Sequence, residues 1–203
     1  MSNDIERSLI EDAICGNINA FEGLVFRYES KIYNIAYRMF NNHEDANDMA
    51  QEALIKIYKN LSKFNFESQF STWVYRVVVN TCLDEIRKRK NKKEVSMDKE
   101  IETAESKAMR EFESAVKSPE EQAIENETIK EVRECIDELK PEFKSIIVLR
   151  DINGFSYTEI AGVLEIKEGT VKSRIARARE NLKKIMEQKM NVKRQINRKE
   201  GDQ

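Results

Sequence analysis

The sequence predicts an all-α protein of two small helical bundles joined by an acidic flexible linker, the second bundle ending in a helix-turn-helix. Three observations favour this fold class. Among 203 residues there are only 6 Gly and 2 Pro, so residues that break helices are scarce. Charged residues make up 35% of the chain and hydrophobic residues 40%, which suits compact, highly charged helical units. Apolar side chains also recur at helical spacing, and a chain of this length accommodates two small domains.

The first bundle is expected over residues 1–93. Its helices are predicted over residues 4–15, 19–40 and 44–61, and from Trp73 into a basic block at residues 87–93. Gly16-Asn17 and Asn41-Asn42 supply breaks, and residues 63–72 are expected to form a polar loop with several aromatic side chains. The run Val77-Val78-Val79 favours a strand locally, but it continues the helical pattern, so we predict helix there.

A linker and a second bundle follow. Residues 94–118 are acidic and polar with few large apolar side chains, which is typical of a flexible tether. Pro119 then stands in the first turn of a new helix, and acidic residues follow it near the positive end of the helix dipole. The second bundle is expected over residues 119–190, with helices near 120–139 and 141–150 before the helix-turn-helix. Residues 191–203 form a basic tail.

Residues 155–184 are predicted to form two short helices around a tight turn. Their buried stripes contain Tyr157, Ile160, Ala161 and Leu164 in the first helix and Val171, Ile175 and Leu182 in the second. Most basic side chains of the second helix lie outside its stripe, and Gly169 and Thr170 stand at its entry, where free N–H groups can meet a phosphate. This pattern favours DNA binding in the major groove over an amphipathic helix pair with a solvated basic face. Glu165 occupies the turn, where glycine most easily supplies a left-handed backbone.

Charge is unevenly distributed along the chain, although the formal net charge is only −2. One basic block lies at residues 87–93 and a second on the last helix of the helix-turn-helix, whereas residues 94–131 are strongly acidic. A polyanion such as DNA would therefore meet two separate docking surfaces.

Several function classes are disfavoured by the composition. Cys15, Cys82 and Cys135 are odd in number and widely spaced, and His43 is the only histidine, so we expect neither a disulfide framework nor a metal site nor another cofactor. We expect no catalytic nucleophile–base pair, and thus no enzyme. No apolar run approaches the length that spans a bilayer, and no signal peptide is evident, so a cytoplasmic protein is expected.

Four motifs, in order, resemble those of the bacterial extracytoplasmic-function sigma factors, the two-domain group that gives RNA polymerase its promoter recognition. AFEGLVFRYESKIYNIAYRMF and DANDMAQEALIKIYKNLSKF are similar to the first two conserved helices of the family. FSTWVYRVVVNTCLDEIRK is similar to its promoter-melting, minus-10-reading helix. SPEEQAI, ELKPEFKSIIVLRDINGFSYTEIAGVL and GTVKSRIARARENL are similar to its minus-35-reading domain.

The resemblance implies site residues, which we carry over by position. For binding to core RNA polymerase these are Asp48, Gln51 and Glu52. For minus-10 DNA they are Asn65, Phe66, Ser68, Gln69, Trp73, Arg76, Asn80, Arg87 and Lys88. For minus-35 DNA they are Glu168, Gly169, Thr170, Lys172, Ser173, Arg174 and Arg177. Packing of Trp73 and Tyr75 in the core is an equal alternative to a DNA contact.

The resemblance further implies promoter DNA as a partner, an anti-sigma factor as a regulator, a role in a stress or envelope response, and no small-molecule substrate. Two features depart from the family. Val74 follows Trp73 where primary sigma factors carry a second tryptophan, and Lys167-Glu168 replaces the commoner proline-containing entry to the reading helix. Two other classes remain as alternatives: a stand-alone repressor or activator, which leaves Asp48, Gln51 and Glu52 without a role, and an enzyme with a DNA-targeting tail, which lacks a catalytic constellation.

Overall fold

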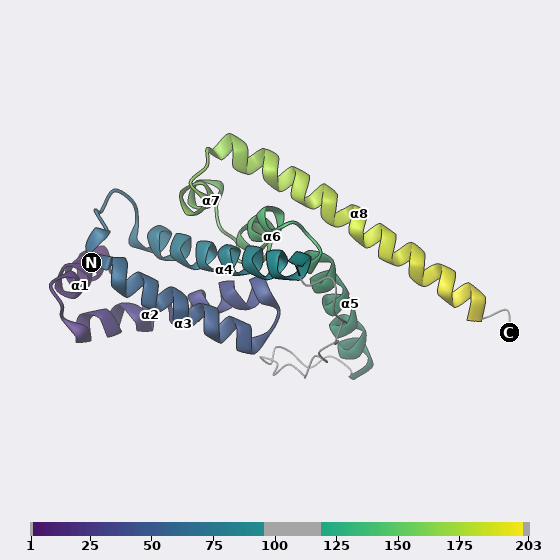
Figure 1. Ribbon diagram of the computed structural model, residues 1–203, viewed down its shortest axis with the longest axis horizontal. Coiled ribbons are helices and arrows are strands. Elements are labelled where there is room, and N and C mark those ends of the chain that lie inside the picture. The colour runs from purple at the N-terminus through teal and green to yellow at the C-terminus, as the bar shows by residue number, and fades with distance from the viewer. Residues whose placement is uncertain (1, 96–118, 201–203) are drawn as a thin grey trace.

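The computed structural model describes the backbone of residues 2–95 and 119–200, and the side chains of residues 4–91 and 127–193. All regular structure within these ranges is helical. The elements are, in order, α1 (Ser2–Ile14), α2 (Ile18–Phe40), α3 (His43–Asn60), the short 3-10 turn η1 (Leu61–Lys63), α4 (Phe70–Val95), α5 (Pro119–Asp137), α6 (Pro141–Ile147), the π-helical turn η2 (Val148–Ile152), α7 (Tyr157–Leu164) and α8 (Glu168–Glu200) (Figure 1). The predicted linker lies outside the described residues except for Glu94 and Val95, which end α4.

Asparagine and serine side chains set the helix boundaries that the sequence suggested. The Asn17 side chain accepts a hydrogen bond from the backbone N–H of Ala20, and Asn42 accepts from Glu44 and Asp45, so both cap helix N-termini. Asn41 ends α2 in the left-handed conformation, with φ of 53°. Ser156 and Glu159 form a reciprocal capping box at the start of α7. These local bonds fix where α2, α3 and α7 begin.

The N-terminal bundle forms around α4, with α2 and α3 against it and α1 against α2 (Figure 1). Its fully buried side chains include Ile32, Ile35, Met39, Val74 and Val78. The valine run at residues 77–79 is helical as predicted, because Val78 and Val79 are completely buried against neighbouring helices. Burial of large aliphatic side chains supplies the main stabilisation of such a bundle.

The fourth helix begins at Phe70, three residues before the predicted start at Trp73. Phe70 is 4% exposed, and its ring contacts Phe64, Tyr28 and Trp73. Burial of this ring draws residues 70–72 into the helix, and the Trp73 N–H donates to the Gln69 carbonyl. Tertiary packing therefore decides this boundary.

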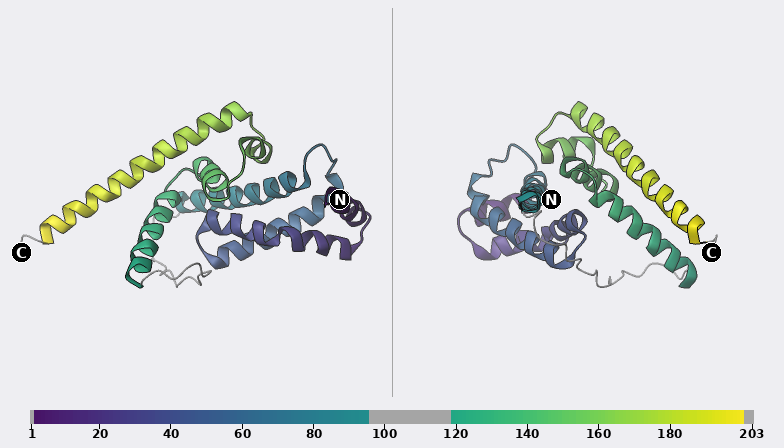
Figure 2. Two further views of the ribbon diagram at one scale, coloured as in Figure 1. Left: turned by 180° about the vertical axis from the view of Figure 1, so that it is seen from behind. Right: turned by 45° about the vertical axis from the view of Figure 1, so that its right-hand side comes forward.

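The C-terminal helices form a second unit that packs directly on the first. α6 packs against α8, and α4 contacts both α6 and α7, so that the buried side chains of the two units form one continuous core. Figure 2 shows the two helical groups side by side, with α8 extending away from the remainder. Residues 191–200 of the predicted basic tail continue α8 as helix.

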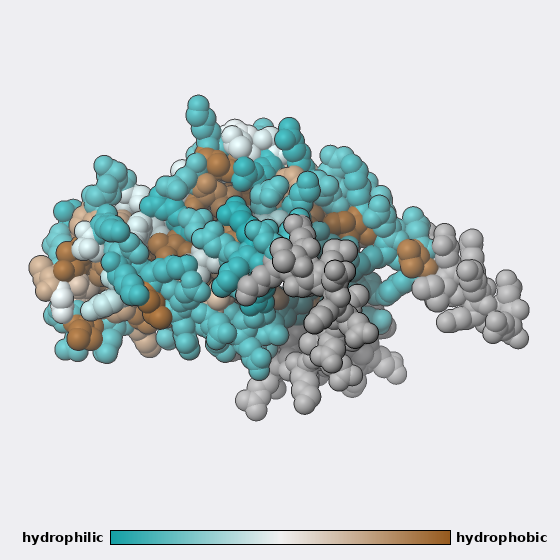
Figure 3. All heavy atoms as spheres, viewed as in Figure 1, coloured by the Kyte–Doolittle hydropathy of each residue, from teal (hydrophilic) through white to brown (hydrophobic). Residues whose placement is uncertain are grey.

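In the view of Figure 3, the described residues present a mostly hydrophilic surface with scattered hydrophobic patches. In residues 2–95 and 119–200, no helix combines the length and apolar character needed to cross a membrane. No group of His, Cys, Asp and Glu side chains in the described part of the chain has an arrangement that could hold a metal ion.

Candidate nucleic-acid interface

The acidic face of α3 presents the three residues predicted for polymerase binding. Asp48, Gln51 and Glu52 are all exposed, and Gln51 and Glu52 lie about one helical turn after Asp48, which places the three on one side of the helix. Sequence reasoning missed that Ile55 and Tyr58 continue this stripe, with 53% and 52% of their surfaces exposed. Their spacing of three residues from Glu52 and from each other was the available signal. The whole face is therefore acidic at one end and apolar at the other.

The loop before α4 presents polar and aromatic side chains to solvent. Asn65, Phe66, Ser68 and Gln69 are all exposed. Phe66 adopts a left-handed backbone, with φ of 60°, and its ring lies 4.9 Å from that of Phe64. A left-handed phenylalanine is unusual, and such strain concentrates at functional sites.

Trp73 occupies a different environment from this loop. It is 8% exposed, and its ring packs 5.6 Å from the rings of both Phe64 and Phe70. Tyr75 is buried to the same extent. In this arrangement both side chains belong to the core, which is the alternative left open by the sequence. The exposed aromatic ring of the loop is that of Phe66.

The outer face of α4 carries the remaining predicted minus-10 residues. Asn80 is exposed, and Arg87 and Lys88 are exposed with ion pairs to Asp84 and Glu85 at 3.4 and 3.5 Å. Such exposed pairs are weak, so both cations remain able to exchange to phosphate. Arg76 differs: its guanidinium lies 2.6 Å from the Glu165 carboxylate, across the boundary between the two units.

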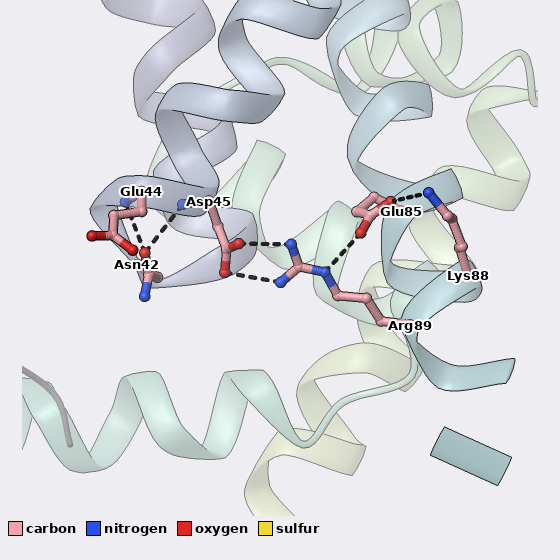
Figure 4. A network of polar contacts seen from close by, with 6 residues as sticks. All are labelled: Asn42, Glu44, Asp45, Glu85, Lys88 and Arg89. Carbon is pink, nitrogen blue, oxygen red and sulfur yellow. Dashed lines mark hydrogen bonds and ion pairs between the residues drawn. The ribbon is translucent and has the colours of Figure 1, made fainter. Parts of the chain in front are cut away.

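One half-buried residue of the basic block, Arg89, has structural partners that the sequence did not reveal (Figure 4). Arg89 donates two hydrogen bonds to Asp45, at 2.9 and 2.6 Å, and a third to Glu85 at 2.8 Å. Hydrogen bonding from Arg89 lowers the pKa of Asp45 below its usual range, and the same bonds raise the pKa of Arg89. Arg89 therefore joins α4 to the start of α3, whereas Arg87 and Lys88 point to solvent.

The helix-turn-helix forms as predicted, from α7 and α8. Glu165 stands in the turn with a left-handed backbone, φ of 53°, as the only residue between α7 and the entry segment Ile166-Lys167. At the entry, the Thr158 hydroxyl donates to the Glu168 carboxylate at 2.6 Å, which ties the start of α7 to the start of α8. Gly169 and Thr170 are exposed in the first turn of α8. The Thr170 N–H donates to the Lys167 carbonyl at 2.8 Å, so an anion here would meet the threonine hydroxyl and the positive end of the helix dipole.

The predicted minus-35 residues are arranged around the exposed side of α8. Val171, Ile175 and Ala178 form its buried stripe. At about 100° per residue, Ser173 and Arg177 point away from this stripe, and Lys172 and Arg174 lie on its two flanks. Lys172, Ser173 and Arg177 are exposed, and Arg174 is half-buried. The geometry gives a helix whose basic side chains can enter a groove while its other face stays packed.

Contacts behind α8 hold it in place. Arg179 donates to Asp151 of η2, at 3.2 Å from Nε, and this bonding raises the pKa of Arg179. Further along, Lys189 pairs at 2.7 Å with Glu138, the residue directly after α5, and Lys193 pairs with Glu131 of α5. The C-terminal part of α8 is thus joined to α5 by ion pairs. These pairs leave the outward side of the first three turns of α8 uncovered.

Comparisons with known proteins agree with this architecture. The Sigma-70 region 2 family matches residues 24–92, and the Sigma-70 region 4 family matches residues 129–182. The chain is 37% identical to ECF RNA polymerase sigma factor SigW of Bacillus subtilis over 172 residues, which cover 83% of this chain and 90% of that protein. It is 34% identical to RNA polymerase sigma-H factor of Pseudomonas aeruginosa, with 92% and 96% covered.

Among solved structures, CnrH in complex with the cytosolic domain of CnrY has a similar fold. The TM-score is 0.62 at 24% identity, and the match covers 90% of this chain and 97% of that chain. At this identity the likeness is one of fold alone.

Proposed function

The chain belongs to the extracytoplasmic-function sigma factors of the sigma-70 family, which direct RNA polymerase to promoters, and we propose how its residues divide that work. As a member of this family it is not an enzyme, since catalysis of transcription belongs to the polymerase. The proposed division has three parts: an α3 face for polymerase, the loop and α4 for minus-10 DNA, and the start of α8 for minus-35 DNA.

The α3 face is proposed as the docking surface for core RNA polymerase. Asp48, Gln51 and Glu52 offer acidic and amide groups to the basic coiled coil that the family resemblance implies. Ile55 and Tyr58 lie next along the same stripe and are half-exposed, so they offer apolar area to the same partner. Interfaces of this kind combine apolar anchors with polar groups at the rim, and complementary charge raises the association rate.

The loop at residues 65–69 and the outer face of α4 are proposed to read minus-10 DNA. Phe66 provides an exposed ring on which an unpaired base can stack, while the polar side chains beside it can bond to the base edge. Asn80 lies further along α4 as a second polar reader, and Arg87 and Lys88 supply phosphate contacts. Trp73 would reach DNA only if the packing of its ring changed.

The first turns of α8 are proposed to read minus-35 DNA in the major groove. Gly169 and Thr170 meet a phosphate at the helix N-terminus, and Glu168 keeps the entry in place through Thr158. Lys172 and Ser173 are exposed close to the helix start, where base edges are reached first. Arg174 and Arg177 mainly supply phosphate contacts.

The proposal extends to domain limits, regulation and location. We assign residues 1–93 to the first domain, 94–118 to the linker, 119–190 to the second domain and 191–203 to the tail. An anti-sigma factor is proposed as the regulator, because the sigma factor RpoE of Bartonella quintana, whose solved structure has a similar fold, is in complex with the anti-sigma factor NepR. A cytoplasmic location and a role in a stress or envelope response complete the proposal.

The observation that best supports this assignment is the exposed α3 stripe, which the core of the bundle does not need. The test is Asp48→Arg in a competition assay for core polymerase. We expect its affinity to fall at least tenfold with the helical content unchanged, because the charge reversal faces a basic partner. Asp12→Arg, the same reversal at an exposed position of α1, is the matched control and should retain affinity. Equal affinity of the two variants would contradict the assignment of the α3 face.

A further inference from the structure

The two domains are in direct contact along α4 and α7. The Tyr75 and Phe155 rings meet edge to face at 5.2 Å, and the Lys31 ammonium lies over both, 5.6 and 5.4 Å from their centroids. A Cβ atom at Gly162 would fall 2.8 Å from Cγ2 of Thr72, so no larger residue fits at this crossing without displacement. The views of Figure 2 show α7 next to the first half of α4. The contact between α4 and α7 is therefore closely packed and includes aromatic rings.

Glu165 adds an ion pair to this contact. Its backbone is left-handed, a conformation that favours glycine and costs free energy for a glutamate. Its carboxylate lies 2.6 Å from the guanidinium of Arg76, one of the proposed minus-10 residues. Only 28% of the Arg76 side chain remains exposed. A glycine would adopt this backbone conformation at lower cost but could not bind Arg76. The ion pair with Arg76 therefore explains why a glutamate stands at a position whose backbone favours glycine.

This arrangement conflicts with promoter binding, if the proposed function is correct. The minus-10 and minus-35 elements are separated by about 25 base pairs, which at 3.4 Å per base pair is about 85 Å of duplex. While Arg76 and Glu165 are 2.6 Å apart, the minus-10 surface of the first domain and the minus-35 surface of the second cannot both contact DNA elements that lie so far apart. The contact along α4 and α7 must break before both surfaces reach DNA.

We propose that the contact of α7 with α4 is a closed, inactive state of the free chain, and that Glu165 is its latch through Arg76. A ligand that binds only the separated domains, here core polymerase with promoter DNA, shifts the population to the open state. The chain thus restrains its own minus-10 surface before any regulator binds.

The distance between the domains can be measured on the full chain with two labels. Cys15 is an exposed native thiol in the first domain, and Lys183→Cys adds one on α8, where the lysine side chain is 75% exposed. Cys82 and Cys135 are buried and do not interfere; burial raises the pKa of the Cys82 thiol to about 12. Spin labels at the two exposed sites report closed and open populations in the free protein and after addition of core polymerase and a promoter duplex.

Glu165→Gln tests the latch, and Glu180→Gln is its matched control. Both remove one negative charge from the second domain without changing side-chain size, but Glu180 pairs with Lys184 in its own helix, at 2.8 Å, and not across the domain contact. Glu165→Gln should raise the open fraction about two- to fivefold, the range expected for loss of an exposed ion pair. Glu180→Gln should leave the open fraction unchanged.

With Glu165 intact, the free labelled chain should show mainly the short distance, with a minor but measurable open fraction, and it should show the longer distance once bound to polymerase and promoter. The proposal is overturned if the free chain is already mostly open, if the two glutamine variants have equal open fractions, or if the short distance persists in a transcribing complex. Failure of the proposed function has a different signature: the labelled chain would not bind core polymerase, while its closed distance and its response to Glu165→Gln would still be measurable.

Discussion

Replacing Arg89 tests whether the polar network at the end of α4 holds the first domain together. Arg89→Ala removes two hydrogen bonds that join α4 to Asp45 at the start of α3, and one bond within α4 to Glu85. It also removes the guanidinium from above the Phe40 ring, 5.1 Å away. The expected result is a less stable first domain with its fold retained.

The magnitude follows from geometry and exposure. Hydrogen bonds to charged groups contribute about 1.5–3 kcal/mol when well formed, whereas exposed ion pairs contribute about 0–1 kcal/mol. The Arg89 and Asp45 side chains are 43% and 28% exposed, so solvent screens part of the attraction. We therefore expect Arg89→Ala to lower the free energy of unfolding by about 1–2 kcal/mol at pH 7.

The effect should depend on pH in a defined direction. Because hydrogen bonding from Arg89 lowers the pKa of Asp45 in the folded state, this contribution is complete above the unfolded pKa, about 3.9. It is lost as the pH falls through the lower folded pKa, when the carboxylate gains a proton. The difference in unfolding free energy between wild type and Arg89→Ala should therefore shrink as the pH falls from about 5 to about 2.

Urea unfolding followed by tryptophan fluorescence is a direct assay, because the single tryptophan, Trp73, lies in the core of the same domain. Arg87→Ala is the control, since its side chain is 63% exposed and has one ion pair, to Asp84 at 3.4 Å. It should change the free energy of unfolding by less than about 0.5 kcal/mol. If the two variants unfold at the same urea concentration, Arg89 does not anchor α4 to α3.

Two further predictions concern DNA. Asn80→Ala should reduce discrimination at one minus-10 position by about 1–3 kcal/mol, measured by selection from a randomised minus-10 library; a uniform loss at all positions would mark Asn80 as structural. Lys172→Ala should change base preference at minus-35, whereas Arg174→Ala and Arg177→Ala should weaken all sequences and flatten the salt dependence by about one unit each. Binding to a minus-35 library at several salt concentrations separates these results, and the reverse pattern would mean that α8 is rotated in the groove.

The sequence predicted the helices well where an apolar stripe and a local cap coincide. In α2, buried residues recur at helical spacing between the Asn17 cap and the left-handed Asn41, and both ends follow from local chemistry. The capping box of Ser156 and Glu159 and the stripe of α7 act in the same way for the helix-turn-helix. Because these signals lie within a few residues of one another, a single sequence reveals them.

Features that depend on distant residues could not be predicted in this way. Arg89 reads as one of several cations in a basic block, and nothing local distinguishes it from Arg87; its partner Asp45 is 44 residues away. Glu165 reads only as a poor turn residue, since its partner Arg76 lies in the other domain, 89 residues away. From the sequence alone, Trp73 could either pack in the core or contact DNA, because an aromatic side chain at that position suits both roles. Tertiary packing resolves each case.

The most direct test of the central claim is run-off transcription with purified core polymerase on genomic fragments, with and without this chain. A promoter-directing factor predicts transcripts that begin only when the chain is present, from sites that share a minus-10 and a minus-35 sequence at constant spacing. Asp48→Arg should reduce these transcripts, and Asp12→Arg should not. Binding of the chain alone to specific duplexes, with no transcript from core polymerase at any of them, would contradict the account and favour a stand-alone repressor or activator.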